Sequence, residues 1–226
     1  MTDYAGAYRD LRVRVTELLR ARPESVVERL TPATPEWRVR DVVAHLGGVC
    51  DDVAHGNMNG VATDTWTQAQ VDKRRDWPFA RVIDDWSEQA RAVEPVMNDF
   101  GQPIGQMLFD AWTHEQDVRG ALGEPGGRDS AAMDVAFDWW LATARAQPVE
   151  QGGPGALRLI TEQETVVLGP GEPTLTLRTT RFELLRTLTG RRSAAQVRSL
   201  DFDGPPLEHL LVSGDIFSPA EHDIVE

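Results

Sequence analysis

The sequence contains very little cysteine and no long hydrophobic run. Cys50 is the only cysteine in 226 residues, which excludes an internal disulfide framework and a metal site built from several cysteines. No stretch approaches the roughly 18 consecutive apolar residues of a membrane-spanning helix. The first residues lack a basic start followed by an apolar run, so we expect no secretory signal and a cytoplasmic location, where thiols stay reduced.

Positive charge is also scarce. The chain has 23 lysines and arginines against 36 aspartates and glutamates, a net charge of −13. Nucleic acids and anionic membrane surfaces bind clusters of basic residues, so we expect neither as a partner. A small molecule or a protein remains as the expected partner, and the sequence leaves monomer and homodimer open.

Aromatic residues are rare in the last third of the chain. All seven tryptophans lie at or before Trp140, whereas threonines gather later. Between the two regions lies QPVEQGGPG, residues 147–155, which is too rich in glycine and proline to continue a helix or a strand. We therefore expect a first domain over 1–147, a linker over 148–155 and a small second domain over 156–226.

Apolar residues of the first region recur at helical spacing. Four or five such helices with short connections are typical of a four-helix bundle. Gly123, followed by Pro125, predicts the end of the fourth helix. The predicted helices span 4–21, 39–58, 79–100, 103–122 and 128–146.

The second region has short runs rich in β-branched or alternating residues, followed by two helical patterns. The runs are separated by turn-forming residues, which predicts an antiparallel meander. Together the two regions predict an α+β protein, a helical bundle with a small C-terminal α+β domain. The predicted strands span 156–160, 165–168 and 174–179, and the predicted helices 181–188 and 194–200.

Two histidines fall on apolar stripes. His45 lies on the stripe of the second helix and His114 on that of the fourth, so both rings should point into the bundle. Asp110, His114 and Asp117 stand at i, i+4 and i+7 along one helix edge. Buried carboxylates need a compensating positive charge, and a divalent cation held by this helix and by His45 would supply it.

A purely structural interpretation stays open on patterning alone. A single histidine on an apolar stripe is usually a satisfied core residue, and a pair Asp-x-x-x-His is short enough to occur by chance. The carboxylates would then be local polar groups. His55 is expected at the surface, and His209 and His222 are expected to have no functional role.

Two segments resemble a known family. TPEWRVRDVVAHLGGV, residues 34–49, is similar to the Trp-x-Val-x-Asp-Val-x-x-His-Leu signature of the mycothiol-dependent maleylpyruvate isomerase-like proteins, and FDAWTHEQDVRGALGEPG, residues 109–126, resembles their second segment. These proteins are similar to the DinB-like metal-binding four-helix bundles. The resemblance covers most of residues 1–147 and, more loosely, the remainder.

The resemblance implies that His45, Asp110 and His114 bind a divalent metal, with zinc expected and nickel, iron or cobalt also compatible with the ligands. Asp110 stands where the mycothiol branch has glutamate. Aspartate is one methylene shorter, so the helix must come closer or a water must bridge. Arg38 also departs from the expected helix-capping serine or threonine, and we expect the helix to start at Thr34-Pro35-Glu36 instead.

The resemblance further implies a reaction with mycothiol as cosubstrate. A thiol at the open metal position would lose its proton and attack a small electrophile, giving S-transfer or cis–trans isomerisation. Asp117 and Arg119 are the expected catalytic residues, Asp117 beside the ligands and Arg119 facing a substrate carboxylate. Cys50 is expected to be a core residue.

Three functions remain open from the sequence. The first is the mycothiol-dependent isomerase or transferase. The second is a metal-dependent hydrolase or lyase in which the metal activates water. The third is a non-enzymatic metal- or ligand-binding protein. A requirement for thiol separates the first from the others, because fold alone does not determine function.

Overall fold

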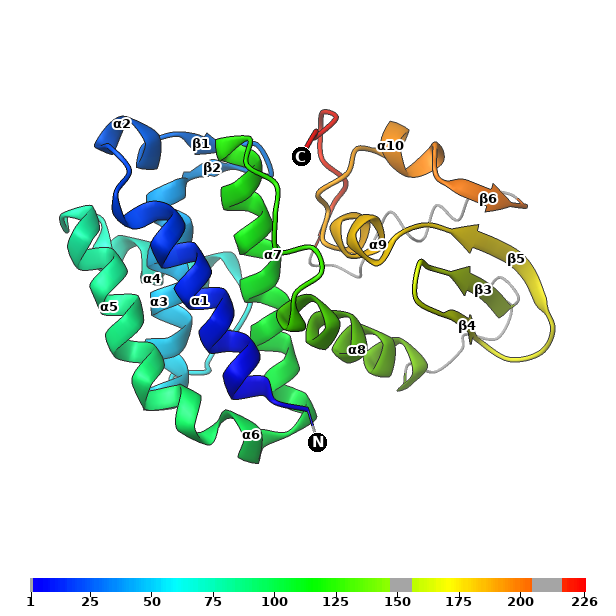
Figure 1. Cartoon of the computed structure of the whole chain (residues 1–226), viewed down its shortest axis with the longest axis horizontal. Coiled ribbons are helices and arrows are strands. Elements are labelled where there is room, and N and C mark those ends of the chain that lie inside the picture. The colour runs from blue at the N-terminus through cyan, green and yellow to red at the C-terminus, as the bar shows by residue number, and fades with distance from the viewer. Residues whose placement is uncertain (1, 147–155, 205–216) are drawn as a thin grey trace. The chain divides into compact units, whose positions relative to one another are not determined.

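The chain forms two compact units. A computed structural model describes residues 2–146, 156–204 and 217–226 (Figure 1). One unit comprises Met1–Ala136 with Glu226, and the other Phe137–Val225. No helix of the described part is both long and apolar enough to cross a membrane. The predicted linker over 148–155 and His209 lie outside the described residues, so the predicted domain boundary remains a prediction.

The first unit is a bundle of four long helices. Contacts join α1 to α5, α5 to α3, α3 to α7, and α7 back to α1, which closes a ring around one core (Figure 1). Each helix buries one apolar face there, as the sequence periodicity predicts. The bundle helices are α1 (Tyr4–Arg20), α3 (Val39–His55), α5 (Phe79–Val93) and α7 (Gly105–Leu122).

Shorter elements that the sequence analysis did not predict connect these helices. The strands β1 and β2 form an antiparallel hairpin before α3, and α4 packs on α3. These elements lack a strong apolar period, which is the signal that reveals the long helices. They are α2 (Glu24–Val27), β1 (Leu30–Thr31), β2 (Thr34–Arg38) and α4 (Asp64–Arg74).

Two starts are expected for the second bundle helix, and residue 39 is correct whereas Thr34 is wrong. Thr34 begins β2, and α3 starts at Val39 with Arg38 as its N-cap. The Arg38 N–H donates to the Asp41 carboxylate at 2.9 Å, which is the carboxylate half of a capping box; the arginine side chain itself has no acceptor to cap the helix. Pro35 holds the residue before it in an extended conformation, and the Thr31 hydroxyl bonds to the Trp37 carbonyl at 3.1 Å, so the segment stays a strand.

Proline also interrupts the predicted helix over 79–100. Pro95 has no N–H to donate, and the chain passes from α5 into a 3-10 turn and then a short helix. The end of α7 is as predicted, because Gly123 caps it in the left-handed conformation with φ 68°. The remaining elements here are η1 (Glu94–Val96), α6 (Met97–Phe100), η2 (Gln102–Ile104) and α8 (Ala131–Ala146).

The second unit contains a sheet of four strands in the order β4-β3-β5-β6. The predicted antiparallel meander is wrong, because β5 pairs in parallel with β3 rather than beside β4. Burial of Leu159 on β3 and Leu177 on β5 brings these strands together. The elements are β3 (Ala156–Ile160), β4 (Thr165–Leu168), β5 (Pro173–Arg178), β6 (Asp201–Asp203), α9 (Arg181–Leu188) and α10 (Ala194–Arg198).

Candidate metal centre

Three side chains from two bundle helices converge on one point. His45 comes from α3, and Asp110 and His114 come from α7; one ligand atom from each lies within 4.8 Å of the others. Asp110 Oδ2 is 3.3 Å from His45 Nε2, and Asp110 Oδ1 is 3.5 Å from His114 Nε2. The structure thus brings together the three residues that the sequence analysis named as ligands, which we call the donor trio.

Helix geometry explains the convergence. Asp110 and His114 stand one turn apart on α7, so their side chains share a face. His45 lies on the buried face of α3, and α3 packs against α7. The shorter aspartate side chain still reaches both imidazole rings. A close helix pair therefore makes up for the missing methylene.

The Nδ1 atom of His114 faces Asp117 at 2.9 Å. The Asp117 side chain is fully buried, and a carboxylate only accepts hydrogen bonds, so Nδ1 donates to it. This leaves Nε2, which faces Asp110 Oδ1 at 3.5 Å, as the nitrogen that can bind a cation. Asp117 therefore orients His114, in the manner of the outer carboxylates that hold metal-binding histidines.

The Nδ1 atom of His45 faces Gln70 of α4, with 2.7 Å between Nδ1 and Oε1. Gln70 is buried. The sequence analysis missed this residue because nothing in the polar sequence of α4 indicates that one glutamine contacts α3. Both rings of the donor trio therefore have an Nδ1 partner and turn Nε2 toward the same carboxylate.

Trp37 of β2 lies against both imidazole rings. Its ring centroid is 5.1 Å from that of His45 and 5.8 Å from that of His114, to which it stacks at 30°. The two imidazoles meet edge to face at 4.9 Å. Trp37 belongs to the sequence motif, but only the β1–β2 hairpin shows that it forms a wall of the site.

The donor trio fits a divalent cation. Two imidazole nitrogens and a carboxylate form a donor set suited to zinc and its neighbours in the first transition row. A tetrahedral ion with ligands at about 2.0–2.1 Å separates neighbouring donors by about 3.3–3.4 Å. The distance from His45 Nε2 to Asp110 Oδ2 is 3.3 Å, and the 3.5 Å from His114 Nε2 runs to the other oxygen, Oδ1. The histidine side chains are at most 8% exposed and that of Asp110 is 36% exposed, so the trio reaches solvent on the Asp110 side.

The remaining predicted residues lie apart from the trio. Arg119 donates from Nε to Glu115 at 3.1 Å and from Nη1 to the Glu124 carbonyl at 3.3 Å, on another face of α7. Its catalytic role remains a prediction. His55 bonds to the Asp51 carbonyl at 2.8 Å with a side chain that is 71% exposed, and Cys50 is buried in the core.

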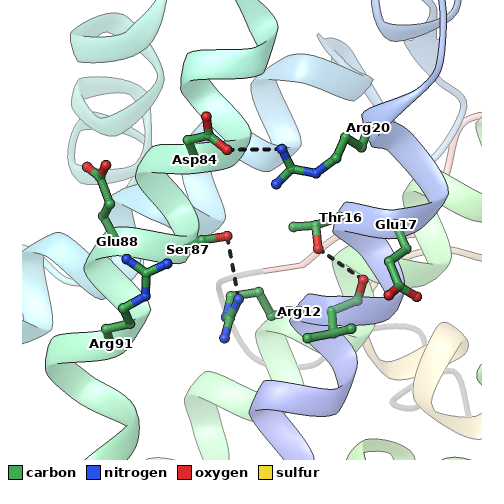
Figure 2. A pocket seen from close by; sticks show the side chains of 9 residues that line it. Arg12, Thr16, Glu17, Arg20, Asp84, Ser87, Glu88 and Arg91 are labelled. Atoms are coloured by element: carbon green, nitrogen blue, oxygen red, sulfur yellow. Dashed lines mark hydrogen bonds and ion pairs between the residues drawn. The ribbon is translucent and has the colours of Figure 1, made fainter.

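A separate groove runs between α1 and α5 (Figure 2). It has a volume of about 380 Å³ and contains no member of the donor trio. Arg20 pairs with Asp84 across it at 3.1 Å, and Arg12 bonds to Ser87 at 3.4 Å. Because these polar groups already satisfy one another, we place the functional site at the donor trio.

Comparisons with known proteins find likeness in structure and not in sequence. No protein family and no curated protein matches the sequence. The crystal structure of a histidine-to-alanine mutant of the mycothiol-dependent maleylpyruvate isomerase is similar, with a TM-score of 0.60, 10% identity, and coverage of 90% of this chain and 94% of that one. A further crystal structure of the mycothiol-dependent maleylpyruvate isomerase has a TM-score of 0.54, 11% identity and the same coverage.

Likeness at this identity establishes the fold. The α+β class predicted from the sequence, a four-helix bundle with a small C-terminal α+β domain, is confirmed. In structure the chain is similar to the mycothiol-dependent maleylpyruvate isomerase.

Proposed function

We propose that the protein is a metal-dependent enzyme that uses a low-molecular-weight thiol, mycothiol, to convert a small electrophilic substrate. The observation behind this proposal is the convergence of His45, Asp110 and His114, with their donor atoms within 4.8 Å. Three protein ligands leave a coordination position for a further group, as in catalytic rather than structural metal sites. The fold shared with a mycothiol-dependent isomerase supports the thiol as that group.

The residues of the site have distinct roles in this proposal. His45, His114 and Asp110 would hold the ion, for which zinc is our first candidate. Asp117 and Gln70 keep the ring protons on Nδ1, and Trp37 shields the imidazoles from water. When bound, the cation lowers the pKa of a coordinated thiol and so supplies a nucleophile at neutral pH. Asp117 thus acts by positioning His114.

The expected reaction is S-transfer or cis–trans isomerisation, and we favour transfer. An anionic substrate such as maleylpyruvate is disfavoured by a chain with a net charge of −13. Arg119, the arginine expected to meet a substrate carboxylate, is already held by Glu115. We further propose a cytoplasmic monomer or homodimer, without nucleic-acid or membrane partners.

The test combines metal binding with thiol-dependent turnover. Protein stripped with a chelator is reloaded with zinc or cobalt and incubated with mycothiol and a panel of electrophiles that includes maleylpyruvate. Loss of thiol and isomerisation are followed separately. Loading should restore turnover, and His45→Ala and His114→Ala should abolish metal retention, because each removes one of three ligands.

The control is His55→Ala, which removes an exposed histidine of the same helix as His45 and should leave metal content unchanged. Turnover that needs metal but no thiol would replace this proposal with the hydrolase or lyase. Metal binding without any turnover above the thiol-only rate would leave a binding protein.

A further inference from the structure

A chain of polar side chains leads from the end of α3 back to His45. Gln70 Oε1 lies 2.7 Å from His45 Nδ1, and Gln70 Nε2 lies 2.6 Å from Asp52 Oδ2. The other Asp52 oxygen accepts a bond from Asn57 at 2.8 Å, so the carboxylate is itself held in place.

The donor and acceptor groups of these side chains fix the direction of each hydrogen bond between them. A carboxylate has no hydrogen to donate, so the Gln70 amide must turn its NH₂ group toward Asp52. The Gln70 carbonyl oxygen then faces His45 and can only accept. Nδ1 of His45 therefore donates to Gln70, which leaves Nε2, 3.3 Å from Asp110 Oδ2, as the nitrogen that can bind a cation.

A glycine on α3 leaves room for the Gln70 side chain beside His45. Gly48 lies about one turn beyond His45 on α3. A Cβ at Gly48 would stand 2.3 Å from the Gln70 Cβ. Any larger residue at Gly48 would push α4 away. Arg74 also donates to the backbone carbonyl of Gln70 at 3.3 Å and to the Asp85 carboxylate at 2.6 Å, which fixes α4 to the bundle.

We propose that Asp52 and Gln70 are positioning residues, a relay that keeps a proton on His45 Nδ1 and so leaves Nε2 for a metal ion. The inference deepens the proposed function, since the purpose of the relay depends on the metal site. The two histidines are then oriented by different kinds of group. Asp117 orients His114 with a charge, whereas the neutral amide of Gln70 orients His45 and keeps the Asp52 charge one residue further from the ion.

The experiment uses Asp52→Asn, which keeps the size of the side chain. An asparagine can donate as well as accept, so the Gln70 amide is free to turn over and offer its NH₂ group to His45. Long-range ¹H–¹⁵N correlation spectra of the metal-free protein, with the His45 signals assigned by their loss in His45→Ala, report the tautomer. The native protein should show His45 Nδ1 protonated, and Asp52→Asn should show a second population in which Nδ1 is unprotonated.

Metal affinity provides the second measurement. Asp52→Asn should weaken zinc binding by about ten- to a hundred-fold, the usual effect of removing a group that orients a ligand. Asp72→Asn is the matched control, because Asp72 accepts from Gln68 at 2.8 Å on the exposed face of α4, the helix that carries Gln70. That control should change neither the tautomer nor the affinity.

Gln70→Met tests the relay independently, with Gln68→Met as its control. Both variants should keep the folded spectrum, and only Gln70→Met should release the His45 tautomer. The relay is refuted if His45 Nδ1 stays fully protonated in both Asp52→Asn and Gln70→Met. Because the tautomer is measured without metal, the relay can stand even if the metal site of the proposed function fails, and the reverse.

Discussion

Cys50 is the only thiol of the chain, and its surroundings make it unreactive. The Trp86 Nε1–H donates to the Tyr8 hydroxyl at 3.0 Å, and that hydroxyl lies 3.0 Å from Cys50 Sγ. All three side chains are buried. Burial raises the pKa of the Cys50 thiol to about 12. A thiol-dependent reaction in this protein must therefore take its thiol from a small molecule.

The Cys50 pKa predicts how stability depends on pH. The unfolded thiol has a pKa of about 8.5 and the folded one a higher value, so folding favours the protonated form. The contribution to stability is complete below pH of about 8.5 and is lost as the pH rises toward the folded pKa. We expect the free energy of unfolding to fall by about 1 kcal/mol per pH unit above this point.

Urea unfolding between pH 7 and pH 10 measures this slope. Cys50→Ser is the control, because a serine hydroxyl keeps a partner for Tyr8 and does not titrate in this range. Its stability should fall less steeply above pH 8.5. Equal slopes in the two proteins would show that Cys50 ionises as easily in the folded state as in the unfolded chain.

At the scale of single elements, α4 is held to the bundle by charge more than by apolar burial. Most of its residues are exposed, but Arg74 is 1% exposed. Arg74 Nε donates to Asp85 of α5 at 2.6 Å, and Nη2 lies 3.3 Å from Asp51 of α3. This arginine joins three helices. It thereby keeps Gln70 against His45.

Arg74→Met should destabilise the protein strongly. Removing one partner leaves the Asp85 carboxylate buried without its main countercharge, which typically costs about 3–5 kcal/mol. Urea unfolding measures the loss. Asp85→Asn added to this variant should recover part of it by removing the stranded charge.

The matched control is Arg75→Met, which replaces the neighbouring arginine at the C-cap of α4. Arg75 is 61% exposed and pairs with Asp72 at the surface, so its replacement should cost less than about 1 kcal/mol. Equal losses in Arg74→Met and Arg75→Met would mean that the buried ion pair does not hold α4.

At the scale of the whole molecule, we keep the domain boundary of the sequence analysis as a proposal. Contacts divide the described chain between Ala136 and Phe137, within α8, so the last turns of that helix pack with the second unit. The composition places the connection later, at the glycines and prolines of 147–155. The two observations agree if α8 belongs in part to each unit and the chain leaves it before the sheet begins.

Limited proteolysis tests this boundary. A protease specific for glutamate should cut first after Glu150, because that residue lies in the segment whose composition disfavours helix and strand. Glu150→Gln should remove that first cut and leave later cuts unchanged. A first cut inside 4–146 would place the most accessible segment in the bundle instead.

Local patterns in the sequence were enough to predict the long helices and the donor trio. Periodicity and the spacing of Asp110 and His114 depend on neighbours within two turns, so they can be read without the fold. The end of α7 at Gly123 follows from a single residue for the same reason. Those patterns also placed His45 on a buried face and made it the candidate for a third ligand, and the resemblance to a family named the same three residues.

By itself, then, the sequence determined where the long bundle helices lie, that the protein is α+β, and which three side chains could bind a metal. Only the tertiary structure decided what surrounds them: Trp37 against both rings, Gln70 and Asp52 behind His45, and β5 beside β3. These contacts join segments far apart in the chain. A side chain's own sequence neighbours state its polarity and its face, but not which distant segment will pack against that face.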